Sequence, residues 1–271
     1  MIAPRKPEPA PATPVRPEDL FTQQSARTYK EFWDCVGRTR AGAYQAVAGT
    51  LGTHIDTPLD EDDLSISGEP VVAIIADKLG VQPEHKVLEI GVGVGRLAEH
   101  MARRCRELHG VDISGNIITE ARRRLAPLDN VRLQVLEHSG LEPLADAQFD
   151  RVYCHIVFIH IDREDLFHYL RESFRVLRPG GRAYFQTNNL LHPSGFRSFE
   201  GVVNEALREG HLNRGHVHFL TAPELRCYVT AAGFRILEDR SHLELTEQAF
   251  DFITPDVQWD HFLIAVVEKP R

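Results

Sequence analysis

The chain has 271 residues, of which 42% are hydrophobic and 26% are charged, and its formal net charge is −8. This composition is that of a soluble globular protein, and the length suits one large domain or a domain with an appendage. No apolar run reaches the roughly 18 residues that span a bilayer, which excludes a membrane-spanning class. The acidic balance argues against a nucleic-acid partner, because phosphate contacts draw mainly on Lys and Arg.

Cysteine usage and the first residues indicate the compartment. The four cysteines lie far apart and form no C-x-x-C pair, so we expect free thiols and no disulfide framework. Residues 1–17 hold six prolines and no apolar segment of the kind that a secretory signal contains. Because proline lacks a backbone donor and fixes φ, this stretch should form a disordered or extended tail. We therefore expect a cytoplasmic protein without a membrane partner.

Helices are predicted between this tail and the first strand. Apolar residues recur at every third or fourth position between Ser25 and Val47, which predicts a helix with one apolar face. A polar loop at Leu59–Asp63 follows. A short helix at Gly68–Leu79 comes next, and Gly80 should end it.

From Lys86 onward the sequence alternates between apolar strands and amphipathic helices. Seven strands are predicted, at Lys86–Ile90, Leu108–Val111, Val131–Leu136, Arg151–His155, Arg182–Thr187, Phe234–Leu237 and Phe262–Val267. Helical stripes lie between them at 94–105, 117–125 and 166–177. Short connections between strands and helices imply a mostly parallel sheet covered by helices on both faces, which is an α/β fold.

The alternation breaks at Asn188–His218, a polar stretch around a helical fragment at Gly201–Arg208. We interpret this stretch as an insertion over the carboxyl edge of the sheet. Thr221 should then begin a helix, with Glu224 completing a capping box. Five regions are thus predicted: a Pro-rich tail at 1–20, a helical lid at 21–82, a central core at 83–187, the insertion at 188–220 and the end of the sheet at 221–271.

The most informative segment follows the first predicted strand. It reads Val87-Leu-Glu-Ile-Gly-Val-Gly-Val-Gly-Arg96, a strand that runs into a Gly-rich turn and then a helix. Glycines in such a turn let the backbone bend tightly and approach a ligand closely. Asp112 lies at the tip of the next strand, about twenty residues later. A carboxylate there can accept hydrogen bonds from both hydroxyls of a ribose, or it can lie near the following helix start without a ligand role.

Four separated motifs in this order resemble those of the class I S-adenosylmethionine-dependent methyltransferases. They are Glu89-x-Gly91-x-Gly93-x-Gly95, Gly110-Val-Asp112-Ile-Ser114, Phe149-Asp150-x-Val152 and Arg175-Val-Leu-Arg-Pro179-Gly180-Gly181. The resemblance covers roughly 71–267, and the Pro-Gly-Gly turn is typical of the small-molecule, methyltransferase type 11-like branch. It implies a Rossmann-like seven-stranded, mostly parallel sheet with helices on both faces and an antiparallel last strand.

The resemblance also implies which residues hold S-adenosyl-L-methionine. Glu89 and the glycines would hold the methionine portion, Asp112 the ribose, and the segment around His138–Leu141 the adenine. Many family members carry Gly-Asp where this chain has Glu137-His138, so Glu137 or backbone groups could replace that carboxylate. The predicted cofactor-binding residues are Tyr29, Trp33, Glu89, Gly91, Gly93, Gly95, Arg96, Asp112, Ile113, Glu137, His138, Ser139, Gly140, Leu141 and His155.

Histidines near the predicted strand tips are candidates for a general base, because imidazole titrates near neutral pH. His155 and His160 follow the fourth strand, whose tip faces the transferred methyl group in the family. His160 can instead be a structural residue that fixes the next helix. His216 is a secondary base candidate within the insertion; with His211 and His218 it matches no common zinc spacing, so no metal is expected.

Tyr29 and Trp33 lie on the predicted N-terminal helix. In related enzymes such a helix covers the cofactor, and an aromatic ring over a sulfonium gains cation–π energy. The alternative is plain core packing, which is common for aromatics at helical spacing.

The expected function is methyl transfer from S-adenosylmethionine to O or N of a small-molecule acceptor by a monomer or homodimer. One alternative is an NAD-dependent oxidoreductase, although Arg96 stands where G-x-G-x-x-G has its third glycine. A second alternative is a catalytically silent regulatory module that binds S-adenosylmethionine. The sequence does not identify the acceptor.

Overall fold

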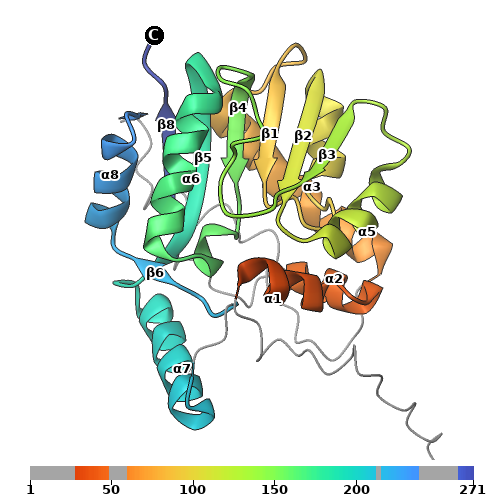
Figure 1. The fold of residues 1–271 in the computed structure, drawn as a ribbon. Helices are drawn as coiled ribbons and strands as arrows, with labels where there is room; N and C mark the ends of the chain where they lie inside the picture. The colour runs from red at the N-terminus through yellow and green to blue at the C-terminus, as the bar shows by residue number, and fades with distance from the viewer. Residues whose placement is uncertain (1–27, 49–59, 212–214, 238–261) are drawn as a thin grey trace, which may run out of the picture.

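A computed structural model of the chain describes residues 28–48, 60–211, 215–237 and 262–271 (Figure 1). The predicted Pro-rich tail lies outside these residues. Where the structure describes the chain, every helix is too short or too polar to span a membrane.

One mixed sheet forms the centre of the molecule (Figure 1). Its strands are β1 (Lys86–Ile90), β2 (Glu107–Asp112), β3 (Val131–Val135), β4 (Phe149–Cys154), β5 (Leu177–Asn189), β6 (Phe219–Leu220), β7 (Arg235–Ile236) and β8 (Phe262–Glu268). The order is β3-β2-β1-β4-β5-β8-β7, and β6 pairs with β5. The strands β1 to β5 run parallel, whereas β8 is antiparallel to both β5 and β7. The predicted Rossmann-like fold is confirmed, with β6 as a two-residue addition.

Helices cover both faces of this sheet and enclose two separate cores. On one face Leu170 of α6 (Arg163–Val176) and Val229 of α8 (Ala222–Ala231) pack in the same apolar cluster as strand residues of β4 and β5. On the other face Ile75 of α3 (Glu61–Leu79) and Ile118 of α5 (Gly115–Leu125) pack together with the short α4 (Ala98–Met101). Two apolar faces on a largely parallel sheet explain why its strands read as nearly continuous hydrophobic runs.

The N-terminal helices differ from the prediction. The single helix expected over Ser25–Val47 is two helices, α1 (Tyr29–Val36) and α2 (Arg40–Ala48). The chain breaks at Gly37, where α1 lies against α5 so closely that a Cβ atom would come within 2.7 Å of Ile117 Cγ1. The loop expected at Leu59–Asp63 is also wrong from Asp60 onward, because Asp60 and Asp63 form a capping box that starts α3. The predicted end of that helix at Gly80 is confirmed, with φ of 59°.

The region after β5 is more ordered than a polar insertion. It contains α7 (Pro193–Glu209), which begins earlier than the predicted fragment because the His192 side chain accepts a hydrogen bond from Ser194 N and Pro193 occupies the first turn. The helix α7 projects from the body of the molecule (Figure 1). The predicted start of α8 is confirmed, since the Glu224 carboxylate accepts a hydrogen bond from Thr221 N at 2.8 Å.

Candidate functional site

The Gly-rich turn follows β1 and is anchored to the neighbouring strand. Gly91 and Val92 both donate backbone hydrogen bonds to Val111 O, at 2.8 and 2.9 Å. Gly91 and Gly93 have φ of 71° and 54°, in the left-handed region that favours glycine. A Cβ atom on Gly91 would lie 2.1 Å from the Val157 side chain, so the turn also packs directly on the chain after β4.

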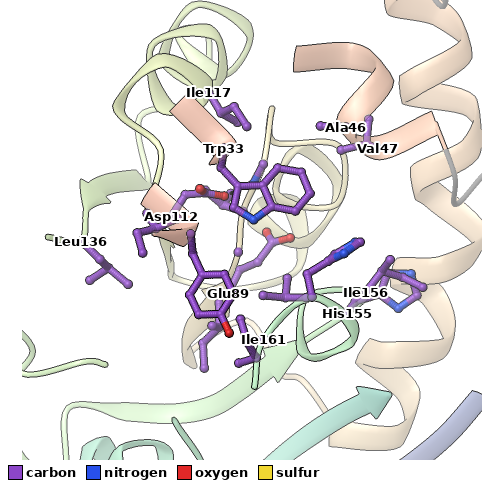
Figure 2. A pocket seen from close by; sticks show the side chains of 18 of the residues that line it. Trp33, Ala46, Val47, Glu89, Asp112, Ile117, Leu136, His155, Ile156 and Ile161 are labelled. Atoms are coloured by element: carbon purple, nitrogen blue, oxygen red, sulfur yellow. Dashed lines mark hydrogen bonds between the residues drawn. The ribbon is translucent and has the colours of Figure 1, made fainter. Parts of the chain in front are cut away.

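A pocket with about 960 Å³ of empty space, open solvent included, lies at the carboxyl ends of β1, β2 and β4 (Figure 2). This is the edge at which ligands bind in open α/β sheets. Eleven of the predicted site residues line it: Tyr29, Trp33, Glu89, Gly91, Gly93, Arg96, Asp112, Ile113, Ser139, His155 and His160. In Figure 2 the Trp33 ring lies between Asp112 and His155. The structure thus brings together residues from α1 and from three strand ends.

Glu89 is a buried carboxylate at the floor of this pocket. Tyr153 Oη donates a hydrogen bond to Glu89 Oε2 at 2.7 Å. Burial raises the pKa of Glu89 to about 8, although Tyr153 and the Arg96 guanidinium oppose this rise. Arg96 is buried as well and donates to Ser67 O at 3.1 Å, and burial lowers its pKa to about 10. This end of the pocket is therefore polar and largely shielded from water, and it can bind a charged group of a ligand.

Asp112 is held at the tip of β2 by backbone donors. Its Oδ2 accepts from Gly93 N at 3.0 Å, and its Oδ1 accepts from Ser114 N at 2.9 Å. Burial raises the pKa of Asp112, while these amide hydrogen bonds favour its ionised form. The first bond ties the carboxylate to the Gly-rich turn, so both predicted features form one rigid unit.

The helix α1 closes the pocket from the outside. The Lys30 ammonium donates to Ile113 O at 3.0 Å and to Leu136 O at 3.4 Å, which ties α1 to the ends of β2 and β3. Tyr29 Oη accepts a hydrogen bond from Asp162 N at 2.8 Å. Tyr29 and Trp33 line the pocket and also pack on apolar neighbours, so core packing is observed and their role over the cofactor stays a prediction.

Two histidines lie at the β4 side of the pocket. Burial lowers the pKa of His155 to about 3, with the Arg96 charge acting in the same direction and Gln186 opposing it. Burial lowers the pKa of His160 to about 4. His160 Nδ1 lies 3.0 Å from Gly215 O, and because a carbonyl only accepts, this nitrogen carries the proton. Both imidazoles are therefore neutral near pH 7.

Six predicted residues do not line the pocket. Gly95 underlies the turn, and the side chains of Glu137 and His138 are 78% and 71% exposed. Glu137 lies 3.8 Å from Lys30 Nζ and so faces α1. Gly140 and Leu141 follow Ser139 in the sequence but do not line the pocket. His216 lines a separate groove under α7. Their assignment to cofactor binding or catalysis stays a prediction.

Sequence reasoning missed three contributors. Tyr153 contacts Glu89 across the β1–β4 pair, and this contact depends on the register of the two strands, for which the sequence carries no signal. Gln186 of β5 lies beside His155. Ile156 has φ of 59°, an unfavourable conformation for a β-branched residue, and no sequence signal marks it.

The polar groups of the pocket fit S-adenosylmethionine. In the order of the strands, the pocket is lined by Glu89 at the end of β1, Asp112 at the end of β2 and the apolar Leu136 after β3. The two polar regions suit the amino-acid part and the ribose of this cofactor, and the apolar region suits its purine. No group of three or more His, Cys, Asp or Glu side chains within the described ranges is arranged to hold a metal ion.

Comparisons with known proteins identify the family of the chain. A family model described as a methyltransferase domain matches residues 87–181. Methyltransferase GfsG of Streptomyces halstedii is 36% identical over 130 residues, which cover 46% of this chain and 45% of that protein. The chain thus spans less than half the length of this relative.

A second relative is covered more completely. Protein-L-isoaspartate O-methyltransferase 2 of Polaromonas sp. is 32% identical over 162 residues, which cover 54% of this chain and 75% of that protein. The structure of an S-adenosylmethionine-dependent methyltransferase from Mesorhizobium loti superposes with a TM-score of 0.55 at 15% identity, over 75% of this chain and 99% of the other. The superposition shows that the two chains share a fold. The 32% identity over 75% of the Polaromonas protein shows the family. The chain belongs to the S-adenosylmethionine-dependent methyltransferases.

Proposed function

We propose that this protein transfers a methyl group from S-adenosylmethionine to an oxygen or nitrogen atom of a small-molecule acceptor. The proposal rests on two hydrogen bonds at the edge of one pocket. Gly93 N donates to the Asp112 carboxylate, and Tyr153 Oη donates to the Glu89 carboxylate. When bound, the cofactor supplies an electrophilic methyl group on a sulfonium. Glu89, Arg96 and Asp112 are the residues proposed to hold it, and family membership removes the case for a dinucleotide oxidoreductase.

The chain's own part in the reaction is to orient the acceptor and to accept its proton. Orientation in near-attack geometry can supply up to about 7–11 kcal/mol, and a positioned base adds roughly 10²- to 10⁴-fold. Ile156, Val157 and Ile161 give the β4 side of the pocket apolar walls, which exclude water from the acceptor.

His160 is the better of the two base candidates that line the pocket. A proton taken up by His155 would create a cation close to the buried Arg96 guanidinium. Burial and the neighbouring His218 and His216 oppose the imidazolium of His160, but its Nδ1 donates to Gly215 O, a contact that supports the imidazolium and leaves Nε2 as the accepting nitrogen. Its ring also makes an edge contact with Trp33 at 5.0 Å between centroids, which fixes its orientation.

Single-turnover transfer of a labelled methyl group to a panel of phenols and amines tests this proposal. We expect transfer by the parent protein, a loss of about 10²-fold or more in His160→Phe, and a smaller loss in His155→Phe. The exposed His168, which pairs with Glu142, provides the control variant His168→Ala. Tight cofactor binding without transfer to any acceptor would leave the silent binding module as the function. Equal rates for His160→Phe and the control would remove the base assignment alone.

A further inference from the structure

A second hollow lies at the edge of the sheet opposite the proposed transfer site. It contains about 1220 Å³ of empty space, open solvent included. Four arginines and one glutamate are among the described residues that line it: Arg151, Arg182, Arg235, Arg271 and Glu268. We call it the arginine hollow. His85 lines it just before β1 begins, whereas Glu89 near the other end of β1 lines the pocket. In Figure 1 the chain ends at this edge, on the side away from α1 and α2.

The register of four neighbouring strands aligns most of these charges in one row. Arg151 of β4 lies opposite Arg182 of β5, and Arg182 also lies opposite Glu268 of β8. On its other side Glu268 lies opposite Arg235 of β7. Residues directly opposite one another point to the same face of a sheet, so the four side chains lie on one face. Since neighbouring strands are about 4.8 Å apart, the row spans roughly 14 Å.

The charges in this row do not balance. Glu268 pairs with both neighbouring arginines, with Arg182 Nε at 3.4 Å and with Arg235 Nη2 at 2.7 Å. One carboxylate therefore serves two guanidinium groups of the row, and Arg151 adds a third. This concentration of positive charge contrasts with the formal net charge of −8 of the whole chain.

Arg151 and Arg182 are like charges at adjacent positions. The Arg151 guanidinium donates to backbone carbonyls at the end of α3, to Leu79 O at 2.6 Å and to Gly80 O at 3.2 Å. Burial lowers the pKa of Arg151, and the Arg182 charge lowers it further, although nearby carboxylates oppose both. Like charges directly opposite one another destabilise a sheet, and an anion bound between them would relieve their repulsion.

We propose that the arginine hollow binds a small-molecule oxyanion with two or more negative charges, of the class of phosphorylated metabolites. Guanidinium groups donate paired hydrogen bonds to phosphate oxygens, and several of them in one concave site favour a multiply charged anion. The side chains of Arg182 and Arg235 are 38% and 61% exposed, which leaves N–H donors open to such a ligand. The acidic balance of the chain disfavours a nucleic acid as the source of the phosphates.

The ligand of this hollow is an effector and not a reactant of the methyl transfer. The length of β1 separates the hollow from the pocket that Glu89 and Asp112 line. The inference therefore does not depend on the proposed function, and binding without turnover tests it.

Pyrophosphate is the probe, and calorimetry on the full chain measures its binding at constant ionic strength, with chloride as the balancing anion. We expect saturable binding that Arg182→Gln and Arg235→Gln each weaken by about tenfold, because each variant removes charge-assisted hydrogen bonds. Glu268→Gln should instead bind pyrophosphate about threefold more tightly or better, since it removes a repelling carboxylate. A merely structural role of Glu268 would not produce a tighter complex.

Arg103→Gln is the matched control. The Arg103 side chain is 56% exposed and pairs with Glu99 at 3.1 Å, much as Arg235 pairs with Glu268, but Arg103 does not line the hollow. Its affinity for pyrophosphate should equal that of the parent. Saturation with S-adenosylhomocysteine should also leave this affinity unchanged, which separates the hollow from the pocket that contains Arg96.

Four outcomes would overturn the inference. The first is the absence of saturable binding, and the second is the same affinity in Arg182→Gln and Arg235→Gln as in the parent. The third is competition with S-adenosylhomocysteine, which would place the anion in the cofactor pocket. The fourth is a short RNA duplex that binds more tightly than pyrophosphate and loses its affinity in the same two variants, which would make a nucleic acid the partner.

Discussion

At the scale of single residues, the buried Glu89 carboxylate links pocket chemistry to stability. Its pKa in the folded protein, about 8, lies above the ordinary value of 4.5, so the folded state holds this proton more tightly than the unfolded state. The stabilisation from the neutral carboxyl is fully present at low pH and is lost as the pH rises from about 4.5 to about 8. Above about pH 8 the carboxyl is ionised in both the folded and the unfolded state, so its contribution to the free energy of unfolding no longer changes with pH.

The variant Glu89→Gln tests this directly. Its amide mimics the neutral carboxyl and cannot ionise, so its free energy of unfolding relative to the parent should increase between about pH 5 and about pH 8 and then level off. Urea unfolding of both proteins across this range measures the difference. A difference that does not change with pH would mean that Glu89 ionises at its ordinary value.

Single residues also show where sequence reasoning reached its limit. The position of Glu89 and Asp112 at one edge of the sheet could be predicted, because Glu89 is the last residue but one of β1 and Asp112 is the last residue of β2, and a parallel sheet brings such strand ends together. The contact between Tyr153 and Glu89 could not, since it joins positions 64 residues apart. The exposure of Glu137 and His138 depends on the path of the chain after β3, which no local pattern fixes.

At the scale of elements, the position of α1 over the pocket depends on a close approach to α5. A Cβ atom on Gly37 would lie 2.7 Å from Ile117 Cγ1 and 3.0 Å from Ile117 N. Asn116 Nδ2 donates to Asp34 O at 2.8 Å across the same junction. The sequence predicted the apolar face of this region but not its break, because Gly37 is required by a distant neighbour and has an ordinary φ of −77°.

We therefore expect Gly37→Ala to push α1 away from α5. Overpacking at such a contact costs about 1–3 kcal/mol, and the displacement of Tyr29 and Trp33 should weaken S-adenosylhomocysteine binding by about tenfold or more. Calorimetry gives the affinity and urea unfolding the stability. Gly115→Ala is the control, because a Cβ atom there meets nothing within 4 Å. An unchanged affinity in Gly37→Ala would show that α1 does not cover the cofactor.

At the scale of the whole molecule, the N-terminal helices are fastened to the α/β core by ion pairs as well as by packing. Glu61 of α3 pairs with Arg40 of α2 and with Arg123 and Arg124 of α5. The contact from Arg124 Nε to Glu61 Oε2 is 2.8 Å, and the Arg124 side chain is only 4% exposed. The alternation of strands and helices predicted the core. The ion pairs of Glu61 could not be predicted, because they join regions that are distant in the sequence and no local pattern marks them.

These contacts make the attachment of the helices dependent on pH. Burial alone would raise the pKa of Glu61, but hydrogen bonds from Tyr44, Arg124 and Arg123 lower it to about 2. The folded pKa lies below the ordinary value of 4.5, so the stabilisation is present above that value and is lost as the pH falls toward about 2. Glu61→Gln should therefore reduce stability by about 1 kcal/mol at pH 7, since Glu61 is partly exposed. Urea unfolding at successively lower pH should show the difference from the parent shrinking below about pH 4.5, and a difference that persists unchanged into acid would mean that packing, and not this charge, holds the helices in place.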